Sequence, residues 1–263
     1  MFLDPYYREE AGLVRIELEQ ASCFAKQIAG DFNPIHDADA RRFCVPGDLL
    51  FALAVVRYGL YEQMGLQFHS MVGRATPLIF SESDGASSSI IDVKDEKGKR
   101  YLEVTCKGER TTELQLIEPF IRRYVAFSGL NFPHYLKPLL EEEGVMFNPE
   151  RPLVVYDHME YKLRTVADAA ADLVFARSAL QVEGRRAAAL LEFEWRGSNG
   201  SVGSGKKKLL LSGLRPYDAD AINAMIKRLE AAKAAHQSEQ QAEGGDSGQQ
   251  QHQALEPLLR DDR

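Results

Sequence analysis

One segment limits the possible folds of this chain more than any other: residues 47–64, which read GDLLFALAVVRYGLYEQM. Its side chains are apolar on nearly every face of a helix as far as Val56, and Pro46 lies just before it, where a helix can begin. A helix that is apolar all round belongs inside a core. The sequence therefore predicts a buried helix over residues 47–64, enclosed by the rest of the chain.

The segments on either side of this helix have the patterns of a mixed fold. Residues 13–18 (LVRIEL) alternate apolar and charged side chains, as a half-buried strand does. Residues 20–29 have helical spacing and are followed by Gly30, a residue typical of helix C-caps. After residue 64 the period shortens, and strands are expected around 68–72, 78–80, 90–93 and 101–106.

The second half of the chain repeats this order of elements. Helical patterns over 120–128 and 135–143 flank a loop at 129–134. Strand-like runs then follow at 153–164, 173–182, 187–196 and 206–212. Helices grouped apart from antiparallel strands predict an α+β fold.

The two loops after the first helix of each half have a similar content. Residues 24–36 read FAKQIAGDFNPIH and residues 120–134 read FIRRYVAFSGLNFPH. Each contains a glycine, an asparagine, a proline and a histidine in that order, but the second lacks the aspartate. Either the chain contains a duplication whose second copy lost its acid, or the similarity is accidental, because short repeats are weak signals. Without that acid, His134 is interpreted as structural.

The turn Gly30-Asp31-Phe32-Asn33-Pro34-Ile35-His36 is the candidate chemical site. It holds a carboxylate, Asp31, and an imidazole, His36, five residues apart, with a proline fixing the backbone between them. Such a pair can orient a water molecule and move its protons. Asn33 can stabilise the loop through side-chain to backbone hydrogen bonds. The alternative is that Asp31 only caps a turn.

The start of the apolar helix is the second part of the candidate site. The first backbone N–H groups of a helix have no partner within it and can bind an anion or a polarised carbonyl oxygen. Gly47 would let a ligand approach the backbone closely. These donors could stabilise the negative charge that develops on a thioester carbonyl oxygen.

The segment from Phe24 to about Gly65 resembles the MaoC-like, R-specific enoyl-CoA hydratase family of hotdog proteins. The family's turn has the pattern G-D-x-N-P-[ILV]-H, and Gly30, Asp31, Asn33, Pro34, Ile35 and His36 match it. The resemblance implies a hotdog fold, in which an antiparallel sheet wraps around the central apolar helix. It also implies that Asp31 and His36 activate the water and that the Gly47 amide receives the thioester oxygen.

The activity implied is reversible hydration of a 2-enoyl thioester of coenzyme A or acyl-carrier protein, giving a 3-hydroxyacyl thioester. The resemblance implies no metal or redox cofactor. Two copies would form a double hotdog, either as a monomer or within a homodimer. The predicted division is an N-terminal hotdog at 1–116, a degenerate second hotdog at 117–216, a helix at 217–234 and a disordered tail at 235–263, which is rich in Gln and Gly.

The helix start departs from the family pattern. The family usually has a His-Gly pair there, whereas Pro46 replaces the histidine and Asp48 follows Gly47 directly. A carboxylate in the first turn stabilises a helix, but it could also occupy the N–H donors and repel a developing enolate. Asp48 is therefore counted among the substrate-binding candidates. Two alternatives to the hydratase stay open: a non-catalytic hotdog protein that binds acyl thioesters or other ligands, and a hotdog thioesterase.

Three basic segments have possible phosphate roles. Arg41 and Arg42 could meet the phosphates of a coenzyme A carrier, because they are close to the site in sequence, or they could be a solvated pair. Residues 200–206, GSVGSGK, nearly match a phosphate-binding P-loop but lack the following Ser or Thr and the following helix. A flexible hairpin with Lys206-Lys207-Lys208 as a solvated strand start is the favoured interpretation.

Composition limits the partners and the compartment. The net charge of −7 argues against a nucleic-acid partner, which would need a basic face. The most apolar run, residues 49–56, is too short to span a bilayer, and the N-terminus lacks the apolar region of a signal peptide. Cys23, Cys44 and Cys106 have no metal-site or disulfide spacing. These observations predict a cytoplasmic protein with reduced thiols and no metal site.

Overall fold

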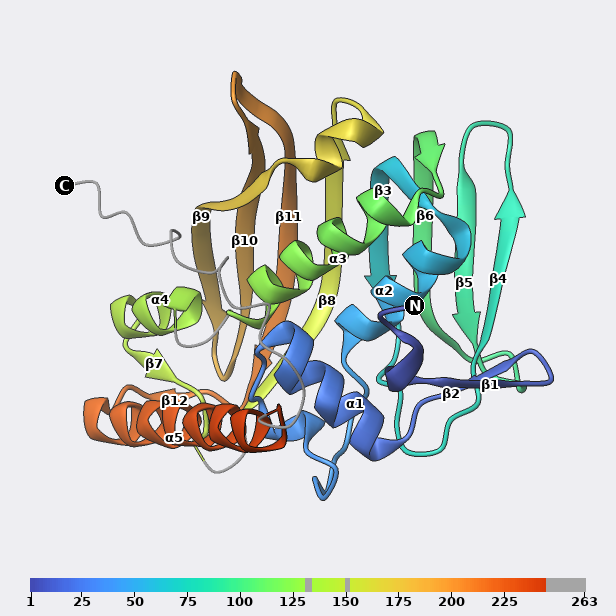
Figure 1. Ribbon diagram of the computed structural model, residues 1–263. Helices are drawn as coiled ribbons and strands as arrows, with labels where there is room; N and C mark the ends of the chain where they lie inside the picture. The colour runs from blue at the N-terminus through green and yellow to red at the C-terminus, as the bar shows by residue number, and fades with distance from the viewer. Residues whose placement is uncertain (131–133, 150–151, 245–263) are drawn as a thin grey trace.

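The computed structural model describes residues 1–130, 134–149 and 152–244 and is dominated by one antiparallel sheet (Figure 1). The strand order is β4-β5-β6-β3-β8-β11-β10-β9. The first four run over Ile79–Asp84 (β4), Ser89–Lys94 (β5), Arg100–Thr111 (β6) and Leu60–Phe68 (β3). The other four run over Leu153–Leu163 (β8), Gly200–Ser212 (β11), Arg186–Gly197 (β10) and Asp172–Glu183 (β9).

The halves of the chain meet at the centre of this sheet, where β3 pairs with β8. Gln63–Gln67 of β3 runs antiparallel to Lys162–His158 of β8, so four strands of each half form one continuous surface. Short strands lie outside it: β1 (Arg8–Glu10) with β2 (Leu13–Arg15), and β7 (Val145–Met146) with β12 (Arg215–Pro216).

The helices gather on one side of the sheet. Figure 1 shows α3 (Leu114–Gly129) lying obliquely across the sheet, with α2 (Gly47–Tyr58) beside it and α1 (Leu18–Phe24) farther out. Helix α4 (Leu136–Glu142) and the first turns of the long helix α5 (Ala219–Gly244) pack against the second half. The predicted α+β double hotdog, a sheet around a central apolar helix, is confirmed.

The central helix α2 is as deeply enclosed as its composition predicts. Every residue from Asp48 to Val55 is buried. The helix ends at Tyr58, however, so the prediction that it continues to Met64 was wrong. Gly59 has a φ of +94°, which stops the helix, and a side chain there would meet the Arg110 side chain and the Thr111 carbonyl at 2.8 Å. The chain then turns directly into β3.

Two predicted strand boundaries also change. The chain forms β3 directly after Gly59, and this strand already ends at Phe68. The strand expected at 68–72 was therefore wrong. The glycine-rich run expected to be a flexible hairpin is the first part of β11. Its glycines serve packing: a side chain at Gly205 would lie 2.4 Å from the Phe193 ring, and one at Gly203 would lie 2.8 Å from Leu163.

Helix α5 is longer than the sequence indicated. It continues to Gly244, so the first ten residues assigned to a disordered tail are helical. The segment HQSEQQAE adds residues that favour helix, Gln, Glu and Ala, although it has almost no apolar surface. The remainder of the predicted tail, residues 245–263, lies outside the described residues.

The largest core is shared by the two halves. Phe51 of α2 packs edge-on against Tyr124 of α3, with ring centroids 5.2 Å apart. Phe120 of α3 stacks on Trp195 of β10 at 5.6 Å. A smaller core lies under α4 and α5 and includes Leu136, Leu140, Ala189, Leu191 and Ile222. The two units predicted from sequence therefore pack around common side chains, and their boundaries at 116 and 216 stay a prediction.

Candidate functional site

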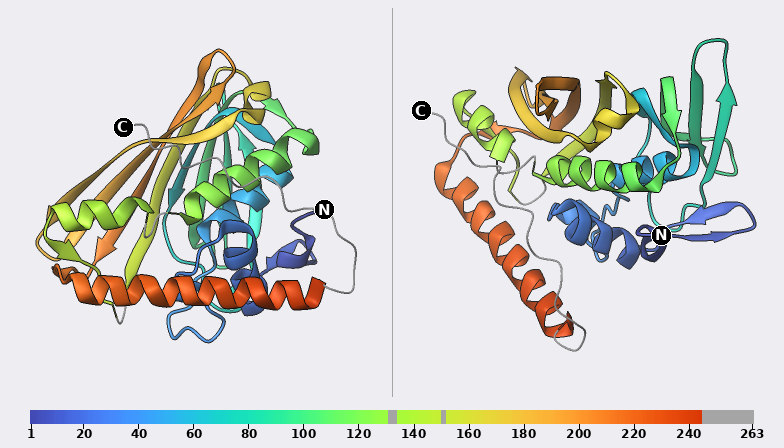
Figure 2. Two further views of the ribbon diagram at one scale, coloured as in Figure 1. Left: turned by 60° about the vertical axis from the view of Figure 1, so that its left-hand side comes forward. Right: turned by 45° about the horizontal axis from the view of Figure 1, so that its top comes forward.

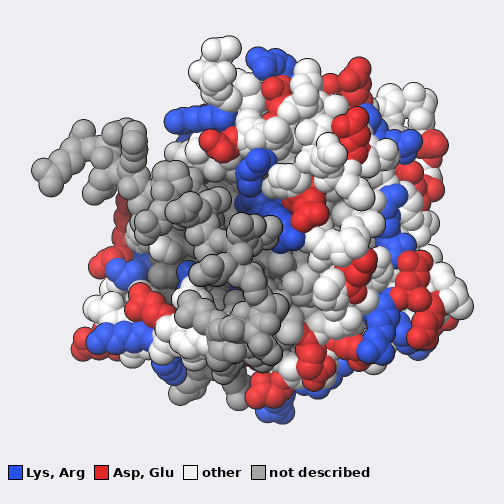
Figure 3. Space-filling model, viewed as in Figure 1, with Lys and Arg blue, Asp and Glu red and all other residues white. Residues whose placement is uncertain are grey.

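A cavity of about 1090 Å³ lies between the loop of residues 29–39, the start of α2, β8, β11 and α5. Asp31, Asn33, His36, Gly47 and Asp48 all border it. The fold thus brings together five of the seven candidate residues, from two segments of the sequence. Figure 3 shows acidic and basic side chains interspersed on the described surface of the face that it displays.

The turn is held by its own side chains. Gly30 has a φ of +63° and caps the preceding helical turn, as expected. The Asp31 Oδ1 atom accepts a hydrogen bond from the Asn33 N–H at 2.9 Å, and the Asn33 Oδ1 atom accepts one from the Ile35 N–H at 3.2 Å. Because Oδ1 makes the local bond, the Asp31 Oδ2 atom is the one nearer His36. These local bonds also explain why Asp and Asn occupy these positions.

The ring of His36 is oriented by the backbone of the next segment. Its Nδ1 atom lies 2.7 Å from the Cys44 carbonyl oxygen. A carbonyl oxygen can only accept, so Nδ1 carries the proton, and in the neutral ring Nε2 is the basic atom. That Nε2 atom lies 3.7 Å from Asp31 Oδ2. This distance is too long for a direct hydrogen bond, and one water molecule can bridge the two atoms.

The space beside the first residue of α2 is so small that only glycine fits there. A side-chain carbon at Gly47 would lie 2.9 Å from the Phe68 ring and 3.2 Å from the Tyr156 ring. As the first residue of the helix, Gly47 has a backbone N–H without a partner inside the helix. This donor borders the same cavity as Asp31 and His36.

Asp48 is turned into the protein. Its Oδ2 atom accepts a hydrogen bond from the Ser128 hydroxyl at 2.5 Å, and its Oδ1 atom has no hydrogen-bond partner among the described residues. Burial raises the pKa of the Asp48 carboxyl, while Lys207 and Ser128 act in the opposite direction. The sequence placed this carboxylate at the helix start but did not indicate its partners.

Lys207 is the residue whose environment differs most from the prediction. It was expected to be solvated, yet it is only 2% exposed, and it borders the cavity. Its ammonium donates to the Ser128 hydroxyl and lies 4.0 Å from the centre of the Tyr156 ring. Burial lowers the pKa of Lys207, and Asp48 and then Asp31 oppose that effect.

A usable signal for Lys207 was present in the sequence. Successive residues of a strand point to opposite faces, so three consecutive lysines cannot all face water on a sheet with one covered face. Lys206 and Lys208 point outward and pair with Glu160 at 2.8 Å and Asp157 at 3.2 Å. Lys207 therefore points inward.

We call Asp48, Ser128, Lys207, Tyr124 and Tyr156 the buried polar cluster. The two phenol hydroxyls are hydrogen-bonded to each other. Burial raises the pKa of both well above 10, so both remain protonated. The cluster joins α2, α3, β8 and β11 beside the cavity and couples both halves of the chain to the start of α2.

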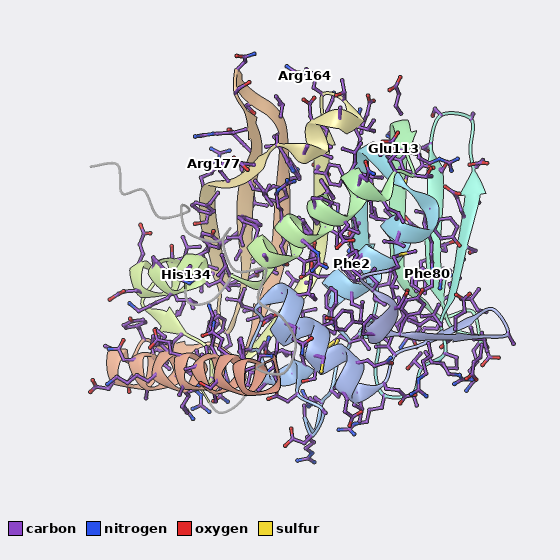
Figure 4. The ribbon with its side chains drawn as sticks, viewed as in Figure 1. Phe2, Phe80, Glu113, His134, Arg164 and Arg177 are labelled. Atoms are coloured by element: carbon purple, nitrogen blue, oxygen red, sulfur yellow. The ribbon has the colours of Figure 1, made fainter. Side chains whose placement is uncertain are left out.

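The second, similar loop lies against the first. Gly129 packs so closely on the Gly30 turn that a side chain there would meet the Ala29 carbonyl oxygen at 1.7 Å. His134, which Figure 4 labels near the start of α4, borders the cavity that Asp31 and His36 border. Residues 131–133 between them lie outside the described residues. The duplication remains a hypothesis.

Arg41 and Arg42 are exposed and do not line the cavity. The basic residues on its wall come from elsewhere: Lys26, which pairs with Asp37 at 2.9 Å, Lys207, and Arg228 and Lys233 of α5. No group of three or more His, Cys, Asp or Glu in the described part of the chain is arranged to hold a metal ion. No helix of that part is both long and apolar enough to cross a membrane.

In the comparison with protein families, the model described as "Protein of unknown function (DUF3581)" matches residues 1–220. Comparison with curated proteins finds no match.

Among solved structures, a protein with the hotdog fold from Alicyclobacillus acidocaldarius is 8% identical over 82% of this chain and 99% of its own, with a TM-score of 0.46. The dehydratase domain of a mycocerosic acid synthase-like polyketide synthase is 12% identical over 82% and 95%, with a TM-score of 0.42. Acyl-CoA thioesterase II TesB2 from Mycobacterium marinum is 11% identical over 82% and 97%, with a TM-score of 0.40. At these identities and TM-scores, we infer neither activity nor substrate from them.

Proposed function

The chain belongs to the DUF3581 family, and we propose that it hydrates 2-enoyl thioesters reversibly to 3-hydroxyacyl thioesters at the cavity bordered by Asp31, His36 and Gly47. One observation carries the proposal. The His36 ring is held by the Cys44 carbonyl with its basic Nε2 atom 3.7 Å from the Asp31 carboxylate, and both residues border the same cavity as Gly47, whose N–H has no partner inside α2.

In the forward direction, a water molecule held between Asp31 and His36 adds its oxygen to carbon 3 of the enoyl group. One of its protons passes to this pair, and carbon 2 receives a proton in return, so one water is consumed. The thioester oxygen carries negative charge in the transition state, and the Gly47 N–H stabilises it there. Partly exposed apolar wall residues receive the acyl chain: Ile35, Phe68, Val154 and Val155.

The Asp48 carboxylate could repel the developing enolate or occupy the N–H donors, but the buried polar cluster opposes both effects. Its Oδ2 atom is bonded to Ser128, and Lys207 provides a compensating positive charge nearby. The carboxylate is thus partly neutralised inside the protein, and it leaves the Gly47 donor to the substrate.

The proposal is tested with crotonyl-CoA by following the loss of enoyl absorbance. We expect Asp31→Asn to lower kcat/KM by at least about a hundredfold, because general acid–base groups contribute on that order. Asp39→Asn is the matched control, since Asp39 also borders the cavity but lies outside the turn. If wild type and Asp31→Asn are equally inert with acyl chains of several lengths, the hydratase proposal fails.

A specific observation favours one alternative, a non-catalytic protein that binds acyl thioesters or other ligands: Asp48 adds a carboxylate next to the proposed oxyanion donor. Thermal stabilisation by an acyl-CoA without turnover would support it. Release of free thiol from acyl-CoA would instead indicate a thioesterase. The carrier, CoA or acyl-carrier protein, the monomeric or dimeric state and the cytoplasmic location remain predictions.

A further inference from the structure

Helix α5 contributes a distinct wall to the cavity. In both views of Figure 2 it starts beside the second half of the sheet, and its later turns extend away from the sheet on the side where α1 lies. Its first turns are packed, with Ile222 fully buried and Met225 only 7% exposed. Beyond these turns α5 crosses the cavity, and its surface there is mostly exposed.

The residues of α5 that face the cavity form an ordered pattern. An apolar stripe with helical spacing runs along Met225, Leu229 and Ala232 to the ring of His236. His236 meets the ring of Phe32, from the candidate turn, with centroids 5.9 Å apart. Arg228 lies on one side of this stripe and Lys233 on the other, as the 100° step between helical residues requires.

These two cations differ from the others on the cavity wall. Lys26 is paired with Asp37, and Lys207 is enclosed in the buried polar cluster. Neither Arg228 nor Lys233 has an ion-pair partner among the described residues; the Arg228 Nε–H donates only to the Ala224 carbonyl at 3.3 Å. Glu230 is the one carboxylate that α5 adds to the wall.

We infer that Arg228 and Lys233 bind the phosphate groups of the nucleotide end of a coenzyme A thioester, while the apolar stripe of α5 covers the arm that leads to the acyl group. Coenzyme A carries two separated anionic points, a diphosphate and a 3′-phosphate, which suits two cations that flank the apolar stripe on the cavity side of α5. Guanidinium and ammonium groups are the usual partners of phosphate. The carrier arm of an acyl-carrier protein offers only one phosphodiester.

This inference deepens the proposed function and names its carrier. It also assigns the phosphates to residues other than Arg41 and Arg42. The family match covers residues 1–220, so Arg228 and Lys233 lie beyond the matched residues.

The test measures binding by calorimetry with butyryl-CoA, a saturated thioester that cannot be hydrated, and with S-butyryl-N-acetylcysteamine, which lacks every phosphate. We expect Arg228→Ala/Lys233→Ala to lower the affinity for butyryl-CoA about tenfold or more at low salt. The affinity for S-butyryl-N-acetylcysteamine should be unchanged. The matched control is Lys227→Ala/Arg215→Ala, which removes two exposed cations that do not line the cavity. Glu230→Gln should strengthen butyryl-CoA binding.

Other outcomes separate the inference from the function on which it rests. Unchanged butyryl-CoA affinity in Arg228→Ala/Lys233→Ala would overturn the inference and leave the hydratase proposal standing. The inference would also be overturned if Arg41→Ala/Arg42→Ala, instead, lowered the affinity for butyryl-CoA but not for the phosphate-free thioester. It would likewise be overturned if the wild type bound butyryl-4′-phosphopantetheine as tightly as butyryl-CoA. Phosphate-dependent binding of 3′,5′-adenosine bisphosphate through Arg228 and Lys233, without hydration of crotonyl-CoA, would support the site while the hydratase proposal fails.

Discussion

At the residue scale, the stability of the protein depends on how the buried charges of Asp48 and Lys207 compensate each other. Both are buried, at 8% and 2% exposure, and the Ser128 hydroxyl joins them by donating to the carboxylate and accepting from the ammonium. Breaking such a buried pair on one side leaves an uncompensated charge, whereas replacing both members with neutral groups is often tolerated.

The first prediction follows from that asymmetry. Lys207→Met should lower the free energy of unfolding by about 3–5 kcal/mol, because Asp48 then lacks its counter-charge. Asp48→Asn/Lys207→Met should recover most of that loss. Urea denaturation of the wild type and these two variants measures both effects, and Lys208→Met, whose side chain pairs outside the core, is the control. Equal losses in the single and double variants would show that the charges are not coupled.

The pH dependence of stability provides a second prediction. Burial raises the pKa of Asp48 above its ordinary value of 3.8, so the folded protein holds this proton more tightly than the unfolded chain. The resulting stability is present below pH 3.8 and is lost as the pH rises through the raised pKa. The stability of wild type relative to Asp48→Asn should therefore fall as the pH rises from 3.8 through the raised pKa. A difference that rises over this range would mean that Lys207 outweighs burial.

At the element scale, the site depends on the close approach of α3 to the turn that ends at Gly30. The third prediction is that Gly129→Ala destabilises the protein by about 1–3 kcal/mol or more, because the added methyl group would overlap the Ala29 carbonyl. Gly73→Ala is the control, since a side chain there meets nothing within 4 Å. Thermal unfolding of the two variants gives the comparison. Equal melting temperatures would show that the two loops are not tightly packed.

Element boundaries follow the sequence where periodicity is strong and depart from it at glycines. The apolar helix is found where its composition predicts, but Gly59 ends it six residues early. The run before Lys206 looked flexible because it contains three glycines, although two of them make room for neighbouring side chains within β11. Glycine signals a loop and a close contact equally well in a single sequence.

At the scale of the whole molecule, the shared sheet and shared core tie the halves together. The fourth prediction is a single cooperative unfolding transition, because Phe120 and Tyr124 of the second half pack around Phe51 of the first. Trp195 is the only tryptophan and is 1% exposed, so its fluorescence reports the second half. Its transition should coincide with that of far-ultraviolet circular dichroism. Separate midpoints would indicate that the halves unfold independently.

The sequence by itself determined the central helix, the α+β pattern and the composition of the Gly30–His36 turn, because each depends on neighbours within a few residues along the chain. Local hydrogen bonds from Asp31 and Asn33 complete that turn without help from distant segments. Only the tertiary structure decided the inward direction of Lys207 and its link through Ser128 to Asp48, and only it placed α5 along the cavity. Those contacts join residues about 80 or more positions apart, and the burial that gives them their energy exists only when the sheet has formed.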